Sequence, residues 1–115
     1  MSVSESFLQY VVDQLQEVGQ INTRRMFGGV GIYSGGLFFA LIADNALYFK
    51  VDSTNIEDFE KLGMKPFKPY KDKNQTMNYY EVPADVLEDC HELAVWAHKA
   101  IAVAANIKGR EDSRN

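Results

Sequence analysis

The sequence predicts an α+β domain in which helices at both ends of the chain pack on one antiparallel β-sheet meander. The middle of the chain consists of short runs rich in β-branched and aromatic residues, separated by Gly and Asn/Asp clusters, which is typical of a meander. Both ends repeat apolar residues at spacings of three and four, as amphipathic helices do. A chain of 115 residues that is 46% hydrophobic and 24% charged suits one domain with one core. The expected element order is α-β-β-β-β-α-β-β-α.

The first helix is expected over residues 4–18. Ser4 suits its N-cap, because the hydroxyl oxygen can accept a hydrogen bond from a free backbone N–H of the first turn. Gly19 follows the last periodic residue, at the position where a left-handed residue commonly ends a helix. The helix carries one apolar stripe, which needs a partner surface that the meander supplies. The stripe consists of Phe7, Leu8, Val11, Val12, Leu15 and Val18.

Four strands are expected between residues 21 and 51. Glycine pairs, and the Asp44 and Asn45 pair, separate them because these residues tolerate the positive φ of tight turns. The segment LFFALIA is apolar at almost every position, whereas a strand with one wet face would alternate. We therefore expect a central strand that is covered on both faces, or covered on one face with a subunit contact on the other. The strands are expected over residues 21–27, 30–33, 37–43 and 46–51.

A short helix and two further strands follow the meander. Ser53 or Thr54 is expected to cap the helix. Residues 64–71 read as a strand that contains two prolines, and proline cannot donate a hydrogen bond to a ladder. This strand is therefore expected at a sheet edge, in a hairpin with a last strand over residues 77–82. The buried edge of the short helix is expected to consist of Ile56, Phe59 and Leu62.

The last helix is expected to begin at Pro83 and to end near residue 107. Trp96 and Val103 lie nearer its polar side than its core side on a helical wheel, so they are candidate residues of a partner interface. The alternative is that a long sheet edge or the first helix covers them. The expected core stripe consists of Val86, Cys90, Leu93, Ala97, Ile101 and Ala104.

Composition and charge limit the number of domains, the ligands and the cellular location that fit this sequence. Residues 1–108 are expected to form a single domain, and residues 109–115 a short disordered polar tail. The formal net charge of −4 disfavours direct nucleic-acid binding by the domain as a whole, although it leaves a local basic patch open. We see no signal peptide and no apolar run of about 20 residues that could span a membrane. A lone cysteine, Cys90, excludes an intrachain disulfide, and these features together favour a cytoplasmic protein.

No arrangement of residues points to an enzyme, a metal site or a cofactor site. His91 and His98 lie two helical turns apart, roughly 10 Å, so one metal ion cannot bind both from a rigid helix. Cys90 falls on the predicted core stripe, which argues against a reactive thiolate. The GGVG motif lacks the spacing of a phosphate loop, and its glycines suit turns better than a close approach of backbone to a ligand. We expect no catalytic residue, no metal and no cofactor.

A cationic and aromatic strip on the sheet is the candidate binding site. Positive charges beside aromatic rings suit a small anion or a single strand of nucleic acid. A regular strand alternates its side chains, so the two successive arginines are expected on opposite faces. The alternative is a solvated face with ordinary cross-strand pairs. The candidate residues are Arg24, Arg25, Tyr48 and Lys50, with Tyr33 and Tyr79 beside them. A second basic cluster, which suits protection of a sheet edge, consists of Lys65, Lys68, Lys71 and Lys73.

Several motifs of this chain resemble the N-terminal domain of the TfoX/Sxy competence regulators. The most specific are RMFGG at 25–29, YYEVP at 79–83 and the Trp96-Ala97 segment, and the resemblance extends over nearly the whole chain. It implies a two-layer α+β fold similar to small secretion-chaperone modules, which commonly form homodimers. The family offers no established catalytic residues to transfer onto this sequence.

The resemblance also implies a function in gene regulation. Family members named for the trait are positive regulators of the genes for natural transformation by DNA, and they act with the cyclic-AMP receptor protein. They carry a second, helical domain, and the resemblance covers only their first part. We therefore expect a non-enzymatic regulatory module that binds a protein partner, either that receptor or the transcription machinery, and that forms a homodimer. The second hypothesis is an anion or single-strand nucleic-acid binder that uses the strip.

Overall fold

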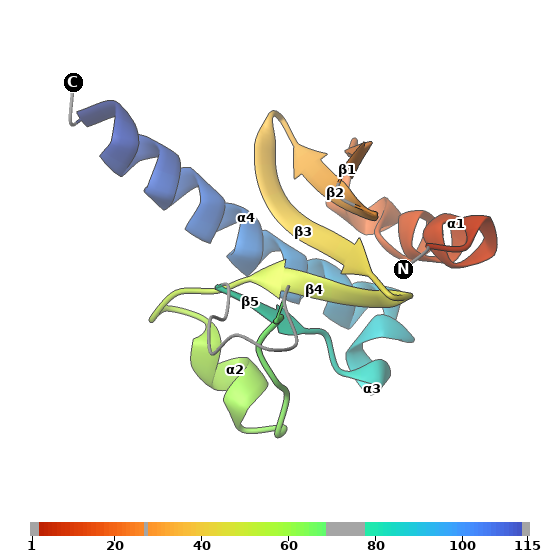
Figure 1. Cartoon of the computed structure of the whole chain (residues 1–115). Helices are drawn as coiled ribbons and strands as arrows, with labels where there is room; N and C mark the ends of the chain where they lie inside the picture. The colour runs from red at the N-terminus through yellow and green to blue at the C-terminus, as the bar shows by residue number, and fades with distance from the viewer. Residues whose placement is uncertain (1–2, 27, 69–77, 114–115) are drawn as a thin grey trace.

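The computed structural model describes residues 3–26, 28–68 and 78–113, and it confirms the predicted α+β class. One helix precedes five antiparallel strands, and the remaining helices follow or interrupt them (Figure 1). The elements are α1 (Glu5–Gln14), a 3₁₀ turn η1 (Gln16–Val18), β1 (Asn22–Met26), β2 (Gly29–Ser34), β3 (Leu37–Ala43), β4 (Ala46–Lys50), α2 (Ile56–Glu60), β5 (Tyr79–Glu81), α3 (Ala84–Leu87) and α4 (Cys90–Ser113).

The sheet has the spatial order β1-β2-β3-β4-β5, so each strand pairs with its neighbours along the chain. The predicted central place of β3 is therefore confirmed. Asp44 and Asn45 turn the chain from β3 to β4 with φ values of 52° and 57°. The Asn45 side chain also accepts a hydrogen bond of 2.9 Å from the backbone N–H of Ser4, which fixes the start of α1 to this turn.

The predicted strand before β5 is reduced to a single bridge between Pro66 and Tyr80. Two backbone hydrogen bonds flank this bridge, from Phe67 to Tyr79 and from Glu81 to Lys65. A longer ladder would need a donor at Pro66, which has no N–H. The expected edge position is thus confirmed for residues 65–67, whereas most of the predicted hairpin turn lies outside the described residues.

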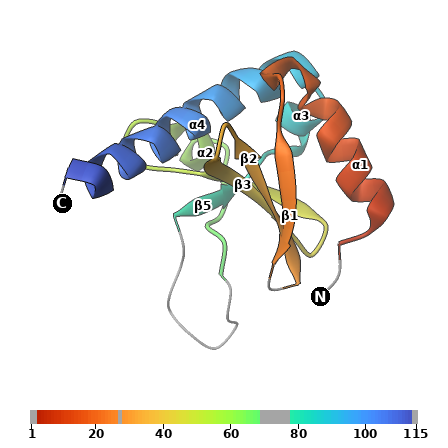
Figure 2. The same cartoon turned by 90° about the horizontal axis from the view of Figure 1, so that it is seen from above.

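The molecule has two layers, with α4 running along one side of the sheet (Figure 2). In the described part of the chain, no helix lies against the opposite side (Figure 2). The core between α4 and the sheet contains fully buried residues from both layers. They include Val11, Leu15, Ile32, Phe39, Ile42, Phe49 and Leu93.

A β-bulge explains part of the unbroken apolar run in β3. Ile32 pairs with Ala40 and Tyr33 pairs with Phe38, so Phe39 has no partner on β2. Phe39 and Ala40 are consecutive, yet both are fully buried. An extra residue in one strand allows this departure from alternation.

The sequence predicted the N-cap of α1 but not that of α2. The Ser4 hydroxyl accepts a hydrogen bond of 3.2 Å from the N–H of Phe7, as predicted. The N-cap of α2 is Asn55, not Ser53 or Thr54. Its buried side chain accepts from the N–H of Asp52 and donates to the carbonyl of Lys50.

The prediction that Leu62 belongs to the buried edge of α2 is wrong. Leu62 is 56% exposed, because α2 ends at Glu60 and the chain has left the helix before it reaches Leu62. Phe59 is buried, as predicted.

The last helix differs most from the prediction, because it is divided into α3 and α4 at Glu88 and Asp89. The Asp89 carboxylate accepts hydrogen bonds from the N–H groups of His91 and Glu92, each 3.1 Å long, and so caps α4. The helix then continues to Ser113, beyond the predicted end and into the segment expected to be a disordered tail. Lys, Arg and Glu are good helix formers, which favours this extension.

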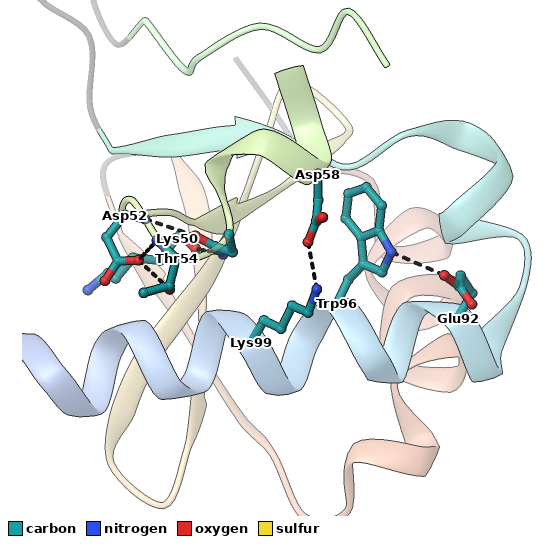
Figure 3. Close-up of polar contacts among 8 residues, drawn as sticks. Lys50, Asp52, Thr54, Asp58, Glu92, Trp96 and Lys99 are labelled. Atoms are coloured by element: carbon teal, nitrogen blue, oxygen red, sulfur yellow. Dashed lines mark hydrogen bonds and ion pairs between the residues drawn. The ribbon is translucent and has the colours of Figure 1, made fainter. Parts of the chain in front are cut away.

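The expectation that Trp96 and Val103 lie outside the core is wrong. Val103 is fully buried, and Trp96 is 9% exposed with its ring edge against Phe59, at 4.8 Å between centroids. The Trp96 indole donates to Glu92, and Lys99 of α4 is paired with Asp58 of α2 at 2.8 Å (Figure 3). Both α2 and the sheet pack against α4. A larger part of the helix surface is therefore buried than a helical wheel with a single core side predicts. A side chain buried within one chain offers no area to a partner.

We predict that Trp96→Ala lowers the free energy of unfolding by about 3–5 kcal/mol, because it leaves a cavity beside Phe59. Urea unfolding followed by circular dichroism measures this change. His98→Ala on the exposed side of α4 is the matched control and should change stability by no more than about 0.5 kcal/mol. Equal stability of the wild type and Trp96→Ala would contradict the packing described above.

Candidate binding face on the sheet

The side of the sheet opposite α4, which we call the open face, carries the predicted strip. Arg24 lies opposite Gly31 in the register, Leu41 opposite Tyr48, and Lys50 opposite Tyr79. Residues that lie opposite one another in neighbouring strands share a face of the sheet. The open face consists of Asn22, Arg24, Met26, Gly31, Tyr33, Phe38, Leu41, Tyr48, Lys50, Tyr79 and Glu81.

Aromatic rings form a row across this face. Tyr33 stacks on Phe38 with 5.0 Å between ring centroids, and Phe38 lies 5.7 Å from Tyr79. A second pair joins Tyr48 to Phe67 at 4.9 Å. Tyr79 is 4% exposed, whereas the other four rings are only partly buried, so the row presents aromatic surface to solvent.

Gly31 lets these side chains lie close to the backbone. A Cβ atom at this position would come within 2.7 Å of Met26 Cε and 3.1 Å of a ring carbon of Phe38. Such distances are shorter than ordinary van der Waals contact. A side chain at position 31 would therefore displace Met26 and Phe38, so glycine here allows a close approach of the protein's own side chains to the backbone.

Two cations accompany the rings. The Lys50 ammonium lies 5.2 Å from the centroid of Phe38 and 5.5 Å from that of Tyr79, within the range of a cation–π contact. Arg24 is exposed at the β1 end of the same face. The acidic residue on this face is Glu81, at the β5 end.

The hydroxyls of Tyr48 and Tyr79 keep their protons at neutral pH. Burial, and then the nearby carboxylates of Glu81 and Asp44, raise the pKa of Tyr48 above its ordinary value of 10.0. Burial raises the pKa of Tyr79 further. Both groups can therefore donate hydrogen bonds, and neither adds negative charge to the face.

The structure brings together three of the four predicted strip residues. Arg24, Tyr48 and Lys50 lie on the open face, whereas Arg25 points to the other side and forms an ion pair with Glu5. The two arginines are thus on opposite faces, as the alternation predicted.

Sequence reasoning missed Phe38 and Phe67 as members of the face. A strict two-residue alternation in LFFALIA cannot be read from the sequence, because the bulge interrupts it. The contact of Phe67 with Tyr48 depends on the β-bridge at Pro66. Because proline disfavours strand pairing, the sequence did not predict the position of this bridge.

A second polar group lies where α4 begins. The Cys90 thiol donates to Glu17 at 3.3 Å, and the other carboxylate oxygen of Glu17 lies 3.1 Å from Nδ1 of His91. Cys90 is only partly buried, so its predicted place in the core is wrong. The helix division at Asp89 shifts the start of α4 and leaves Cys90 beside η1.

The hydrogen bond with Glu17 raises the pKa of the Cys90 thiol, and the bonds from His91 and Cys90 lower the pKa of Glu17. A catalytic cysteine needs the opposite shift, towards thiolate. Within residues 3–26, 28–68 and 78–113, no three His, Cys, Asp or Glu side chains are placed to hold a metal ion. None of the helices in these ranges is long and apolar enough to cross a membrane.

Fold and face together define a small two-layer α+β domain with an aromatic and cationic sheet surface. Residues 13–104 match the TfoX N-terminal domain. The chain belongs to the TfoX N-terminal domain family, as its motifs predicted.

The chain is also similar to DNA transformation protein TfoX1 of Aliivibrio fischeri (strain ATCC 700601 / ES114). The two sequences are 35% identical over 81 residues, which is 70% of this chain and 37% of that protein. This chain therefore matches only part of the length of its relative.

We predict that Glu17→Gln lowers the pKa of the Cys90 thiol, because the substitution removes the carboxylate that disfavours the thiolate. The rate of alkylation by iodoacetamide should then rise at lower pH than in the wild type, since only the thiolate reacts. Glu57→Gln on α2 is the matched control, with the same charge change far from the thiol in sequence. Superimposable pH–rate profiles for the wild type and Glu17→Gln would contradict the assigned hydrogen bond.

Proposed function

We propose that this chain is a cytoplasmic, non-enzymatic regulatory module that takes part in the control of DNA-transformation genes by binding a protein partner. Membership of the TfoX N-terminal domain family supports the proposal. So does the similarity to a relative that is named a DNA transformation protein. The expected partner is the cyclic-AMP receptor protein or another part of the transcription machinery.

One observation carries the choice of binding over catalysis. The apolar residues of β3 that face α4 are fully buried, whereas Phe38 and Leu41 on the open face remain partly exposed. A continuous apolar surface that the protein leaves in water commonly marks an interaction site. The shifted pKa of Cys90, by contrast, moves its thiol away from nucleophilic chemistry.

The open face is also the surface that fits the partner best. Burial of Trp96 and Val103 removes the alternative surface on the last helix. The open face combines aromatic rings with an arginine at its rim, and both residue types are enriched in the hot spots of protein interfaces.

We predict that Leu41→Glu lowers capture of the cyclic-AMP receptor protein by about tenfold or more, because it places a charge at the centre of the open face. The measurement immobilises the purified chain and quantifies the retained receptor with cyclic AMP present. Val95→Glu is the matched control, since Val95 is 43% exposed on α4. Circular dichroism melts must show that both variants fold.

Equal capture by the two variants would contradict the proposed face, and no capture by the wild type would contradict the proposed partner. Sedimentation of the same three proteins tests the expected homodimer. A dimer that dissociates only in Leu41→Glu identifies the second copy as the occupant of this face.

A further inference from the structure

We propose that the open face binds single-stranded nucleic acid, with bases stacked on its aromatic rings and phosphates held by Arg24 and Lys50. The inference goes beyond the proposed function, because it requires no protein partner. It rests on the distribution of charge and on the geometry of the rings.

The net charge of −4 is distributed unevenly between the strands and three of the helical elements, α1, η1 and α2. The five strands contain Arg24, Arg25 and Lys50 but a single acid, Glu81. Elements α1, η1 and α2 contain acids and no Lys or Arg. Those acids are Glu5, Asp13, Glu17, Glu57, Asp58 and Glu60. A polyanion is therefore repelled by these helices and attracted to the sheet.

The open face itself carries two cations, Arg24 and Lys50, and one acid, Glu81, and the Asp44 carboxylate lies near Tyr48. Arg24 makes no ion pair with any of the described residues, whereas Arg25 on the other side is paired with Glu5. Lys50 lies among the rings. Lys65 and Lys68 are exposed in the segment beside β5, so they extend the positive charge past the edge of the face.

The rings are arranged as a platform for bases. Tyr33 on β2 and Phe38 on β3 stack with an interplanar angle of 23°, so their ring planes are nearly parallel. Tyr79 is nearly completely buried and lies 5.7 Å from Phe38, and Tyr48 and Phe67 form a second aromatic pair. Bases stack on such rings without regard to sequence, because every base has a π face.

Among nucleic acids, the combination of rings and cations selects a single strand. A protein partner also buries exposed rings, so the oligonucleotide measurements below decide between protein and nucleic acid. A duplex would offer phosphates, but its base faces are hidden in the stack. A single strand presents both groups, and sheet platforms with aromatic side chains are one known means of binding it.

The test measures fluorescence anisotropy of labelled oligothymidylate and oligouridylate of about 15 nucleotides with the purified full chain over a range of salt concentrations. Each phosphate contact contributes about 0.7 to the slope of log K against log salt for a single strand. We expect Arg24→Ala to reduce this slope by about 0.7 and Arg25→Ala to leave it unchanged. The two arginines are neighbours with equal charge on opposite faces of the sheet. A difference between the two variants therefore reports binding at the open face and not the loss of one positive charge.

A second pair of variants tests the stacking. Tyr33→Leu keeps an apolar side chain but removes the ring, and should weaken binding by about tenfold with an unchanged salt slope. Tyr80→Leu, on the other side of β5, should leave the affinity unchanged. Binding of either oligonucleotide supports the inference, and a preference between them identifies DNA or RNA as the source.

Two results would overturn the inference. The first is no binding of either oligonucleotide by the wild type at low salt, and the second is an equal effect of Arg24→Ala and Arg25→Ala. If the first result is found together with loss of receptor capture in Leu41→Glu, the face is assigned to a protein and the proposed function remains intact, so the two proposals can fail separately.

Discussion

One-sided burial of the sheet by α4 is the constraint on which the rest of the structure depends. Leu93, Ala97 and Ala100 of α4 are almost completely buried against the strands. The small side chains of Ala97 and Ala100 let the helix axis approach the sheet closely, and Ile42 and Phe49 are fully buried beneath it. The hydrophobic core therefore lies between α4 and one side of the sheet. The side chains on the opposite side do not contribute to this core.

Two local irregularities adapt the chain to that packing. The bulge at Phe39 turns consecutive residues towards the core, and the cap at Asp89 starts α4 with a new phase relative to α3. The new phase brings Trp96 against Phe59 and leaves Cys90 at the surface with Glu17. Both irregularities have a local cause, a surplus residue in one case and a capping carboxylate in the other, but each changes which side chains meet across the domain.

The open face and the helical side differ in charge as well as in shape. Carboxylates on α1 and α2 pair with Arg25 and Lys99. On the open face, Lys50 lies beside Phe38 and Tyr79, and Arg24 is exposed. Binding of a protein partner and binding of a single strand of nucleic acid are both compatible with such a surface. Its rings offer contact area with little loss of side-chain entropy, and its cations attract an anionic partner from a distance.

The sequence by itself determined the fold class, the order of the first four strands, the turn at Asp44 and Asn45, the cap at Ser4 and the family. These features depend on residues close together in the chain, whose propensities and spacing can be read directly. Only the tertiary structure decided that Trp96 and Val103 are buried and that Arg24, Tyr48 and Lys50 share a face with Phe38 and Phe67. Burial and grouping depend on elements far apart in the chain, such as α2 against α4. A helical wheel or an alternation count contains no information about those elements.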